Sequence, residues 1–299
     1  MAQYLNSAGV PLPLAVYLAT DHYDYEENTV SATTLLKPIR AQILGSRLPD
    51  DVQGADVISM VKSRMGTSIH DGLEKAWSNG NHIKAMKALG YPDSVIERVV
   101  VNPTHPLAPE DFPVYLEKRA YKEVAGVMVS GKFDFVMEGR VRDLKNTGTY
   151  TWTKGIKTED YKLQGSIYRL LNPEIITDDV MSVDFIFWDW MQGHTSNPDY
   201  PQLPTMSKDI PLMDITETED FVANRINAFR AHANTPNDDL PLCSDEELWR
   251  DAPTYKYYKV SASYLEGKRS TKNYTNMAEA NLRLAEDGGQ GIVVTVPSK

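Results

Sequence analysis

The sequence predicts an α/β protein with a mixed central β-sheet flanked by helices, and with additions at both ends of the chain, helical at the N-terminus. Two observations predict this class. Segments with strand-like apolar residues cluster between residues 121 and 190. Segments whose apolar residues recur at helical spacing lie before, within and after this cluster. The order helix, three strands, helix, strand favours a mixed sheet.

The part of the chain before the strands is expected to be helical. Residues 31–44 carry an apolar stripe behind Ser31 or Thr33 as a cap. Residues 56–77 favour one or two helices, and Asp93 is expected to cap a short helix that ends near residue 99. Four prolines between residues 102 and 113 predict a loop.

Three strands are expected next, at residues 121–129, 132–137 and 141–146, the last two joined by a tight turn at Glu138 and Gly139. Thr158 is expected to cap a helix to residue 171 with an acidic first turn. The remaining elements are expected in this order: a strand at 180–190, a loop at 197–211, an amphipathic helix at 216–232, and a terminal strand, helix and strand at 255–264, 277–285 and 291–296.

These elements predict a division into two parts. Residues 1–253 are expected to form one domain, with a core at about 31–190 and an acidic helix–loop region at 173–253. Residues 254–299 are expected to form a small strand–helix–strand extension packed on the same domain.

Composition restricts the function. Cys243 is the only cysteine, which excludes an internal disulfide, a four-cysteine zinc site and a four-cysteine iron–sulfur cluster. No apolar run is long enough for a membrane span, and the first residues lack the features of a signal peptide, so a cytoplasmic location is expected.

The charge is unevenly distributed along the chain. The net charge of −10 by itself argues against a nucleic-acid partner. Residues 113–172, however, hold 11 Lys/Arg and 7 Asp/Glu, whereas residues 173–253 hold 4 and 17. A phosphate backbone responds to the local field, so the first stretch allows DNA binding. Ordinary solvated faces explain this mild pattern equally well.

The predicted hairpin carries the clearest functional pattern. A short loop at Glu138 and Gly139 would place Asp134 opposite Asp143, with side chains about 5 Å apart. Phe133, Phe135 and Leu144 would lie on one face of the hairpin, and the two aspartates and Lys145 on the other. Facing carboxylates repel unless a cation lies between them, and hard oxygen ligands suit Mg²⁺ or Mn²⁺. A surface salt-bridge cluster would have the same pattern.

Two weaker patterns accompany the hairpin. His70 and Glu74 share one helix face, so an imidazole metal ligand and a carboxylate that holds a water are plausible, as is a simple surface hydrogen bond. Tyr161, Gln164 and Tyr168 form one helical stripe, which suits contacts with a phosphate and a base, or a half-buried amphipathic helix.

The ordered set of motifs resembles the RecB-like branch of the PD-(D/E)xK nuclease superfamily, whose fold is a restriction-endonuclease-like core. The matching residues come in the family's order over about residues 31–190: Gly66, His70 and Glu74; Gly131 and Asp134; Asp143, Leu144 and Lys145; and Gln164 and Tyr168. Glu117 resembles the acidic residue that often precedes the first core strand in this family.

The resemblance implies a free-standing, phage-type nuclease in a host cytoplasm. It implies that His70, Asp134, Asp143 and the Leu144 carbonyl bind Mg²⁺ or Mn²⁺, with two ions expected, and that Lys145 acts on the attacking water. It gives Glu74 a supporting catalytic role, and Gln164, Tyr168, Tyr161 and Glu117 the ordering of the site or contacts with DNA.

The expected activity is a DNA exonuclease that acts on linear duplex or single strands in phage replication, recombination or DNA degradation. An endonuclease with the same chemistry and a non-catalytic DNA-binding or scaffold module are the alternatives. A homo-oligomer or a recombination partner protein is conceivable, and no membrane partner is expected.

Overall fold

The computed structural model describes residues 4–20, 26, 28–49, 54–248, 250 and 252–297. The chain forms two compact units. The larger unit comprises Met1–Lys37 and Ala41–Asn237, and the smaller comprises Pro38–Arg40 and Asp238–Lys299. The division at residue 254 and the packing of the extension on the larger domain stay predictions.

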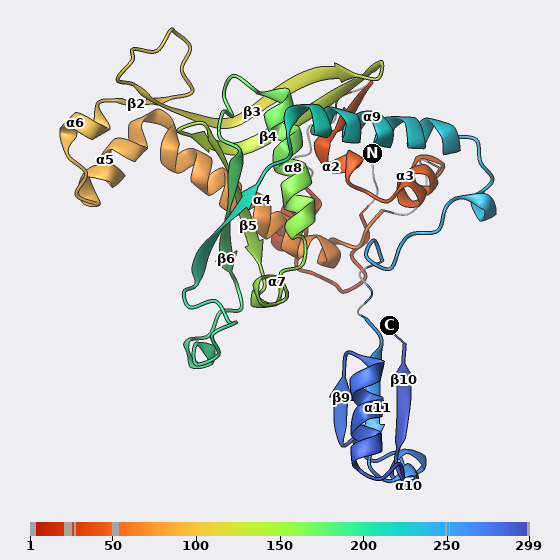
Figure 1. Cartoon of the computed structure of the whole chain (residues 1–299). Coiled ribbons are helices and arrows are strands. Elements are labelled where there is room, and N and C mark those ends of the chain that lie inside the picture. Colours follow the sequence, from red (N-terminus) through yellow and green to blue (C-terminus); the bar gives the residue numbers. More distant parts are fainter. Residues whose placement is uncertain are drawn as a thin grey trace. The chain divides into compact units, whose positions relative to one another are not determined.

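The chain begins mainly with helices, continues with four consecutive strands, and then mixes helices and strands to its end (Figure 1). The helices are α1 (Leu12–Ala19), α2 (Ala32–Leu35), α3 (Ile39–Ser46), α4 (Val61–Trp77), α5 (Asn81–Ala88), α6 (Asp93–Ile96), α7 (Thr149–Lys154), α8 (Thr158–Leu171), α9 (Ile215–His232), α10 (Ser261–Leu265) and α11 (Met277–Glu286). The strands are β1 (Thr29–Ser31), β2 (Val99–Val101), β3 (Phe112–Val124), β4 (Val127–Met137), β5 (Arg140–Thr147), β6 (Val180–Phe187), β7 (Thr205–Pro211), β8 (Thr254–Tyr258), β9 (Lys272–Tyr274) and β10 (Ile292–Val296).

The larger unit is built on a seven-stranded mixed sheet, which confirms the predicted fold class. Six strands follow the order β2-β3-β4-β5-β6-β7, and β1 pairs with β4 outside this path. The pairs β1–β4, β2–β3 and β5–β6 are parallel, whereas β3–β4, β4–β5 and β6–β7 are antiparallel. The parallel pair β5–β6 is connected through α7 and α8, as a parallel connection requires.

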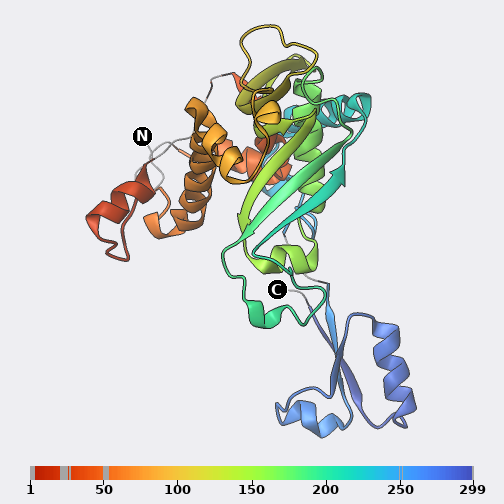
Figure 2. The same ribbon diagram turned by 90° about the vertical axis from the view of Figure 1, so that its left-hand side faces the viewer.

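Helices cover both faces of this sheet (Figures 1 and 2). On one face, residues of α8 and α9 join the main hydrophobic core, in which Phe133, Ile167 and Val222 are fully buried. On the other face, Leu73 and Trp77 of α4 pack against a smaller cluster that includes Phe135. The sheet is therefore held from both sides, and β4 contributes to both clusters.

Several local predictions were wrong. The strand expected at 121–129 is a hairpin, because Ala125 and Gly126 both take positive φ angles and turn β3 into β4. The expected loop at 197–211 contains β7, which pairs with β6. The helix expected at 31–44 is divided into α2 and α3 around Pro38, whose ring is incompatible with a continuous helix.

The predicted helix boundaries agree with the structure better than the predicted N-cap residues do. Ser31 caps α2 through a hydrogen bond that its side chain accepts from the Thr34 N–H, as predicted. α8 spans the predicted residues 158–171, but Lys157 is its N-cap and Thr158 is its first residue. In the same way Pro92, and not Asp93, is the N-cap of α6.

The smaller unit contains a three-stranded antiparallel sheet in the order β10-β8-β9. Residues of α11 pack against this sheet, and Tyr257 is fully buried in their common cluster. The predicted order strand, helix, strand is present, with α10 and β9 added between β8 and α11. Within the described part of the chain, no helix combines the length and apolar character needed to cross a bilayer.

Candidate metal centre

The turn between β4 and β5 sets the register of the candidate site. Met137 pairs with Arg140, Val136 with Val141 and Phe135 with Arg142. Glu138 and Gly139 form the two-residue loop, with φ angles of 53° and 76°, which is the combination that a type I′ hairpin turn requires. The predicted tight turn is therefore confirmed.

The two strands separate one step further from the turn. The next residues in this register are Asp134 and Asp143, the predicted facing pair, but the paired ladder ends at Phe135 and Arg142. The Asp134 carboxylate instead accepts a hydrogen bond of 3.0 Å from the backbone N–H of Leu144. On the same edge of β4, β1 pairs with residues 128–130, so residues 131–134 lie between two partner strands.

On the other edge of β4, Glu117 breaks the regular conformation of β3. Leu116 pairs with Phe135 and Lys118 with Phe133, and Glu117 lies between these pairs with a φ angle of 49°. A positive φ in a residue other than glycine is uncommon and is stabilised only by its surroundings. It is here that Glu117 joins Asp134 in the candidate site.

The same region changes the side-chain alternation of β4. Phe133 belongs to the main core together with Val136, whereas Phe135 belongs to the cluster under α4 and contacts Trp77 edge-to-face at 5.2 Å between ring centroids. The prediction that Phe133 and Phe135 share one face was therefore wrong, because strict period-two alternation does not hold around Asp134.

Three side chains from three elements form a group that could hold a metal ion. His70 of α4, Glu117 of β3 and Asp134 of β4 each offer one ligand atom, and these atoms lie within 4.8 Å of one another. Glu117 also pairs with Lys132, at 2.6 Å between Oε2 and Nζ. The site thus gathers residues that are 47 and 17 positions apart in the sequence.

The His70 ring lies between two oxygen acceptors. Its Nδ1 is 3.3 Å from Oδ1 of Asp134, and its Nε2 is 3.1 Å from the carbonyl oxygen of Leu144. A neutral imidazole donates from only one nitrogen, so hydrogen bonds to both oxygens need the protonated ring. The hydrogen bond with Asp134 raises the pKa of His70, against the opposing effect of burial. The pocket therefore favours a positive charge.

Asp143 and Lys145 form a buried ion pair next to this group. Their Oδ2 and Nζ atoms are 2.7 Å apart, and the side chains are 2% and 27% exposed. Burial raises the pKa of Asp143, although the Lys145 ammonium opposes this shift. Burial is the largest single effect on Asp134 and acts to raise its pKa, but the hydrogen bonds from His70 and Leu144 and the charges of His70 and Lys145 together lower the pKa of this carboxyl. Asp134 is thus the stronger anion of the two.

The predicted helical stripe of α8 lies on the Lys145 side of the site. The Lys145 ammonium is 5.6 Å from the centroid of the Tyr161 ring. Gln164 donates a hydrogen bond of 2.8 Å from Nε2 to the Tyr168 hydroxyl. Tyr168 also lies directly over Gly131, where an added Cβ would come within 3.1 Å of the Tyr168 ring. Burial, together with the two site aspartates, raises the pKa of Tyr168 well above its usual range.

The structure thus brings most of the predicted residues together, with two differences. Glu117, expected to order the site, lies in the potential metal group, whereas Asp143, expected as a ligand, lies outside it and faces Lys145. Glu74 is exposed and lies outside the group, so its catalytic role stays a prediction. Lys132, the partner of Glu117, was missed by the sequence analysis.

The chemistry of the donor atoms fits a divalent cation. Two carboxylates, an imidazole and a backbone carbonyl are ligands that Mg²⁺ or Mn²⁺ accept. In addition, Oδ2 of Asp143 is buried without a hydrogen bond of normal geometry among the described residues, despite its contact with Lys145. An under-satisfied buried carboxylate oxygen beside a pocket that favours positive charge suits a cation.

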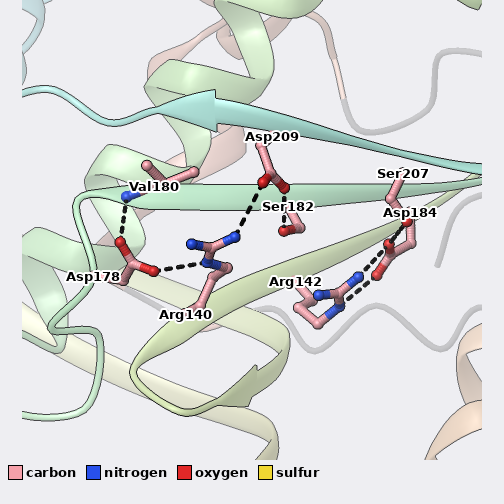
Figure 3. A network of polar contacts seen from close by, with 8 residues as sticks. All are labelled: Arg140, Arg142, Asp178, Val180, Ser182, Asp184, Ser207 and Asp209. Atoms are coloured by element: carbon pink, nitrogen blue, oxygen red, sulfur yellow. Dashed lines mark hydrogen bonds and ion pairs between the residues drawn. The ribbon is translucent and has the colours of Figure 1, made fainter.

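The arginines of the hairpin do not add free positive charge to this site. Figure 3 shows Arg140 bound to Asp178 and Asp209, and Arg142 bound to Asp184. Asp184 also accepts a hydrogen bond from Ser207, and Asp209 accepts one from Ser182. These contacts join β5, β6 and β7, so part of the basic excess in residues 113–172 is neutralised by the acidic stretch that follows it.

No protein-family model matches the chain, and no curated protein matches it. Among solved structures, the protein SSO0001 is 16% identical, with 75% of this chain and 85% of that chain covered and a TM-score of 0.43.

Two further structures have lower scores. A phage-related exonuclease from Haemophilus somnus 129PT is 15% identical, with 69% and 93% of the two chains covered and a TM-score of 0.31. A protein provisionally named an exonuclease, from Eubacterium rectale, is 12% identical, with 81% and 96% covered and a TM-score of 0.35.

Proposed function

We propose that this protein is a divalent-metal-dependent DNA exonuclease of phage type, which hydrolyses phosphodiester bonds of linear DNA in replication, recombination or degradation. The observation that carries the proposal is the convergence of His70, Glu117 and Asp134 beside the buried pair of Asp143 and Lys145. A site that combines hard anionic ligands with one partly buried ammonium group is suited to phosphoryl transfer.

Four groups are the proposed ligands of the metal ion. Asp134, Glu117, His70 and the Leu144 carbonyl would hold Mg²⁺ or Mn²⁺, with Asp143 as a further ligand once the ion draws its carboxylate from Lys145. The bound ion would polarise the scissile phosphate and lower the pKa of a water. A second ion is expected only from the resemblance to the PD-(D/E)xK nucleases.

Lys145 would act on the developing charge. Its ammonium is held by Asp143 and covered by Tyr161, so it is oriented before substrate binds. The pKa of Lys145 is raised, because the attraction of Asp143 and Asp134 outweighs the effect of burial, and the group enters the reaction as a cation. It would orient the attacking water and stabilise charge on the phosphoryl oxygens. Gln164 and Tyr168 would keep the α8 side of the site in place through their hydrogen bond.

The proposal is tested with end-labelled linear duplex, single-stranded DNA and a circular plasmid, each with EDTA, Mg²⁺ or Mn²⁺. We expect metal-dependent release of nucleotides from linear DNA and an intact circle. Asp134→Asn and Lys145→Ala are expected to abolish cleavage. Asp184→Asn is the matched control, because it changes a carboxylate of the adjacent strand β6 that pairs with Arg142 outside the site.

Each alternative predicts a different result. Cleavage of the circle would identify an endonuclease with the same chemistry. Metal-independent binding of DNA without cleavage, together with no saturable Mn²⁺ binding by calorimetry, would identify a non-catalytic binding module. Full metal-dependent activity of a pure Asp134→Asn preparation would refute the assignment of the site.

A further inference from the structure

Two exposed aromatic side chains, each accompanied by a lysine, lie at the carboxyl ends of β5 and β6. Trp188, which follows β6, is 51% exposed, and the ammonium of Lys62 is 5.3 Å from the centroid of its ring. Tyr150 in α7, which follows β5, is 54% exposed, and the ammonium of Lys154 is 6.0 Å from its ring centroid. At this edge of the sheet two exposed aromatic rings therefore each have a lysine ammonium beside them, a combination that can bind a ligand with flat aromatic groups and negative charge.

This surface is connected to the candidate metal centre by two elements. In α4, His70 contacts the Leu144 carbonyl, and Lys62, eight residues earlier, contacts Trp188. In the sheet, Thr147 follows Leu144 by three residues in β5. The backbone carbonyl of Thr147 accepts a hydrogen bond from the backbone N–H of Trp188. Both elements therefore lead from the metal centre to Trp188, α4 towards its N-terminus and β5 towards its C-terminus. Eight residues of helix, at 1.5 Å each, separate His70 from Lys62 by about 12 Å along α4.

The Trp188 ring is held in position by its neighbours. An added Cβ at Gly148 would lie 3.1 Å from Oδ2 of Asp189 and 3.3 Å from Cζ2 of Trp188, so the glycine allows the Trp188 ring and the Asp189 carboxylate to pack closely against the backbone. The next residue, Asp189, accepts a hydrogen bond of 2.7 Å from the N–H of Thr149 at the start of α7. The segment that carries the indole is thus fixed at both ends before any ligand binds.

The chemistry of the surface points to unpaired nucleotides. Every base has an aromatic face, and stacking of bases on aromatic side chains beside cationic groups is the usual way in which proteins bind single strands. Lys62 has no carboxylate within ion-pair distance among the residues that the structure describes, so its charge remains available to a phosphate. In a paired duplex the bases are stacked on each other and their faces are closed to such contacts.

We propose that Trp188 and Lys62, with Tyr150 and Lys154, bind the unpaired part of the DNA strand whose end occupies the metal centre. A base that stacks on Trp188 displaces the Lys62 ammonium from the ring, and the long lysine side chain then pairs with a neighbouring phosphate. At about 3.4 Å for each stacked nucleotide, a distance of about 12 Å places this contact three to four nucleotides from the reacting phosphate. The inference rests on the proposed function and specifies its substrate as a strand with unpaired bases.

The experiment measures binding by the metal-free, full-length protein. The ligands are a fluorescent oligodeoxythymidylate of about 12 nucleotides and a blunt hairpin duplex of similar charge. We expect Trp188→Ala to weaken binding of the oligodeoxythymidylate about 5- to 150-fold, the range for loss of one stacked base, and to change binding of the duplex less than about 2-fold. Trp188→Phe is expected to retain most of the affinity, because the phenyl ring still stacks.

The controls separate stacking from general effects. Tyr91→Ala removes an aromatic side chain that is also 51% exposed but lies in the turn after α5, and we expect it to leave both affinities unchanged. Lys62→Met is expected to reduce the salt dependence of oligodeoxythymidylate binding by about one phosphate contact. Circular dichroism spectra of the variants check that each remains folded.

The outcomes distinguish this inference from the proposed function. Equal affinity of Trp188→Ala and the wild type for the oligodeoxythymidylate, or no binding by the wild type, overturns the inference. If the wild type binds in the expected way but cleaves no DNA with Mg²⁺ or Mn²⁺, the proposed function fails and the binding surface stands. If it cleaves linear DNA while Trp188→Ala binds normally, the inference alone fails.

Discussion

Replacement of Lys145 by methionine should destabilise the metal-free protein strongly. Methionine preserves much of the aliphatic packing of lysine but removes the ammonium 2.7 Å from the Asp143 carboxylate, which is only 2% exposed. Removal of one partner of a buried ion pair costs about 3–5 kcal/mol, because the other charge stays buried without compensation. Since the Lys145 side chain is 27% exposed, water can approach the position of the ammonium, and the lower end of this range applies.

Protonation of Asp143 sets an upper limit to the loss. A buried carboxylate without a partner can take up a proton, and protonation at pH 7 of a group with an ordinary pKa of about 3.9 costs about 4 kcal/mol. The expected loss in the free energy of unfolding at pH 7 is therefore about 3–4 kcal/mol. At pH 5 protonation costs only about 1.5 kcal/mol, so the loss should fall to about that value.

The assay is urea unfolding in EDTA, followed by tryptophan fluorescence at pH 7 and pH 5. Four of the five tryptophans precede residue 238, so the signal reports mainly on the larger unit. The second variant combines Lys145→Met with Asp143→Asn, which removes the unpaired charge, and we expect it to regain about half of the lost stability or more. Equal stability of the single and double variants at pH 7, or a loss that does not depend on pH, would refute the reasoning.

Three further predictions concern the metal, the packing of the site and the core. Because the pKa of His70 is raised, its proton should stabilise the metal-free protein at low pH, and this stabilisation should be lost as the pH rises through the pKa of the folded state. A metal ion competes with that proton, so the Mn²⁺ affinity measured by calorimetry should rise with pH by up to about tenfold per unit. An affinity that is constant from pH 6 to pH 8 would contradict this prediction. Gly131→Ala would place a Cβ 2.7 Å from Leu171 Cδ1 and 3.1 Å from the Tyr168 ring, so a loss of about 1–3 kcal/mol in urea unfolding and slower cleavage are expected; unchanged stability and rate would show that α8 yields freely. Phe133→Ala should cost about 3–5 kcal/mol, because Phe133 is fully buried in the main core; a loss under about 1 kcal/mol by the same measurement would show that the core closes around the cavity.

The hairpin was predictable because its signals are local. Glu138 and Gly139 are suited to a two-residue turn, and the residues that flank them fix the register of Met137 and Arg140 without further information. Asp134 and Asp143 follow from that register by counting. His70 was identified only through the ordered motifs, since a helix face by itself does not say which strand it meets.

The role of Glu117 was not predictable from the sequence, for a physical reason. Its place in the metal group depends on a positive φ in the middle of a long strand, which is imposed by tertiary contacts and has no local signature. The irregular side-chain alternation in the same region is the reason why the prediction that Phe133 and Phe135 share one face was wrong. Trp188 was also overlooked, because one strand was predicted over residues 180–190, whereas β6 ends at Phe187 and leaves the Trp188 side chain exposed.

The short strand β1 has a consequence for the solution behaviour of the chain. Its three residues occupy backbone positions of β4 at 128–130 that would otherwise be open. An unoccupied strand edge is a template for another polypeptide, including a second copy of the same protein. Loss of residues 1–31, by proteolysis or by a late start of translation, should therefore increase the exchange of strands between chains or the precipitation of the protein.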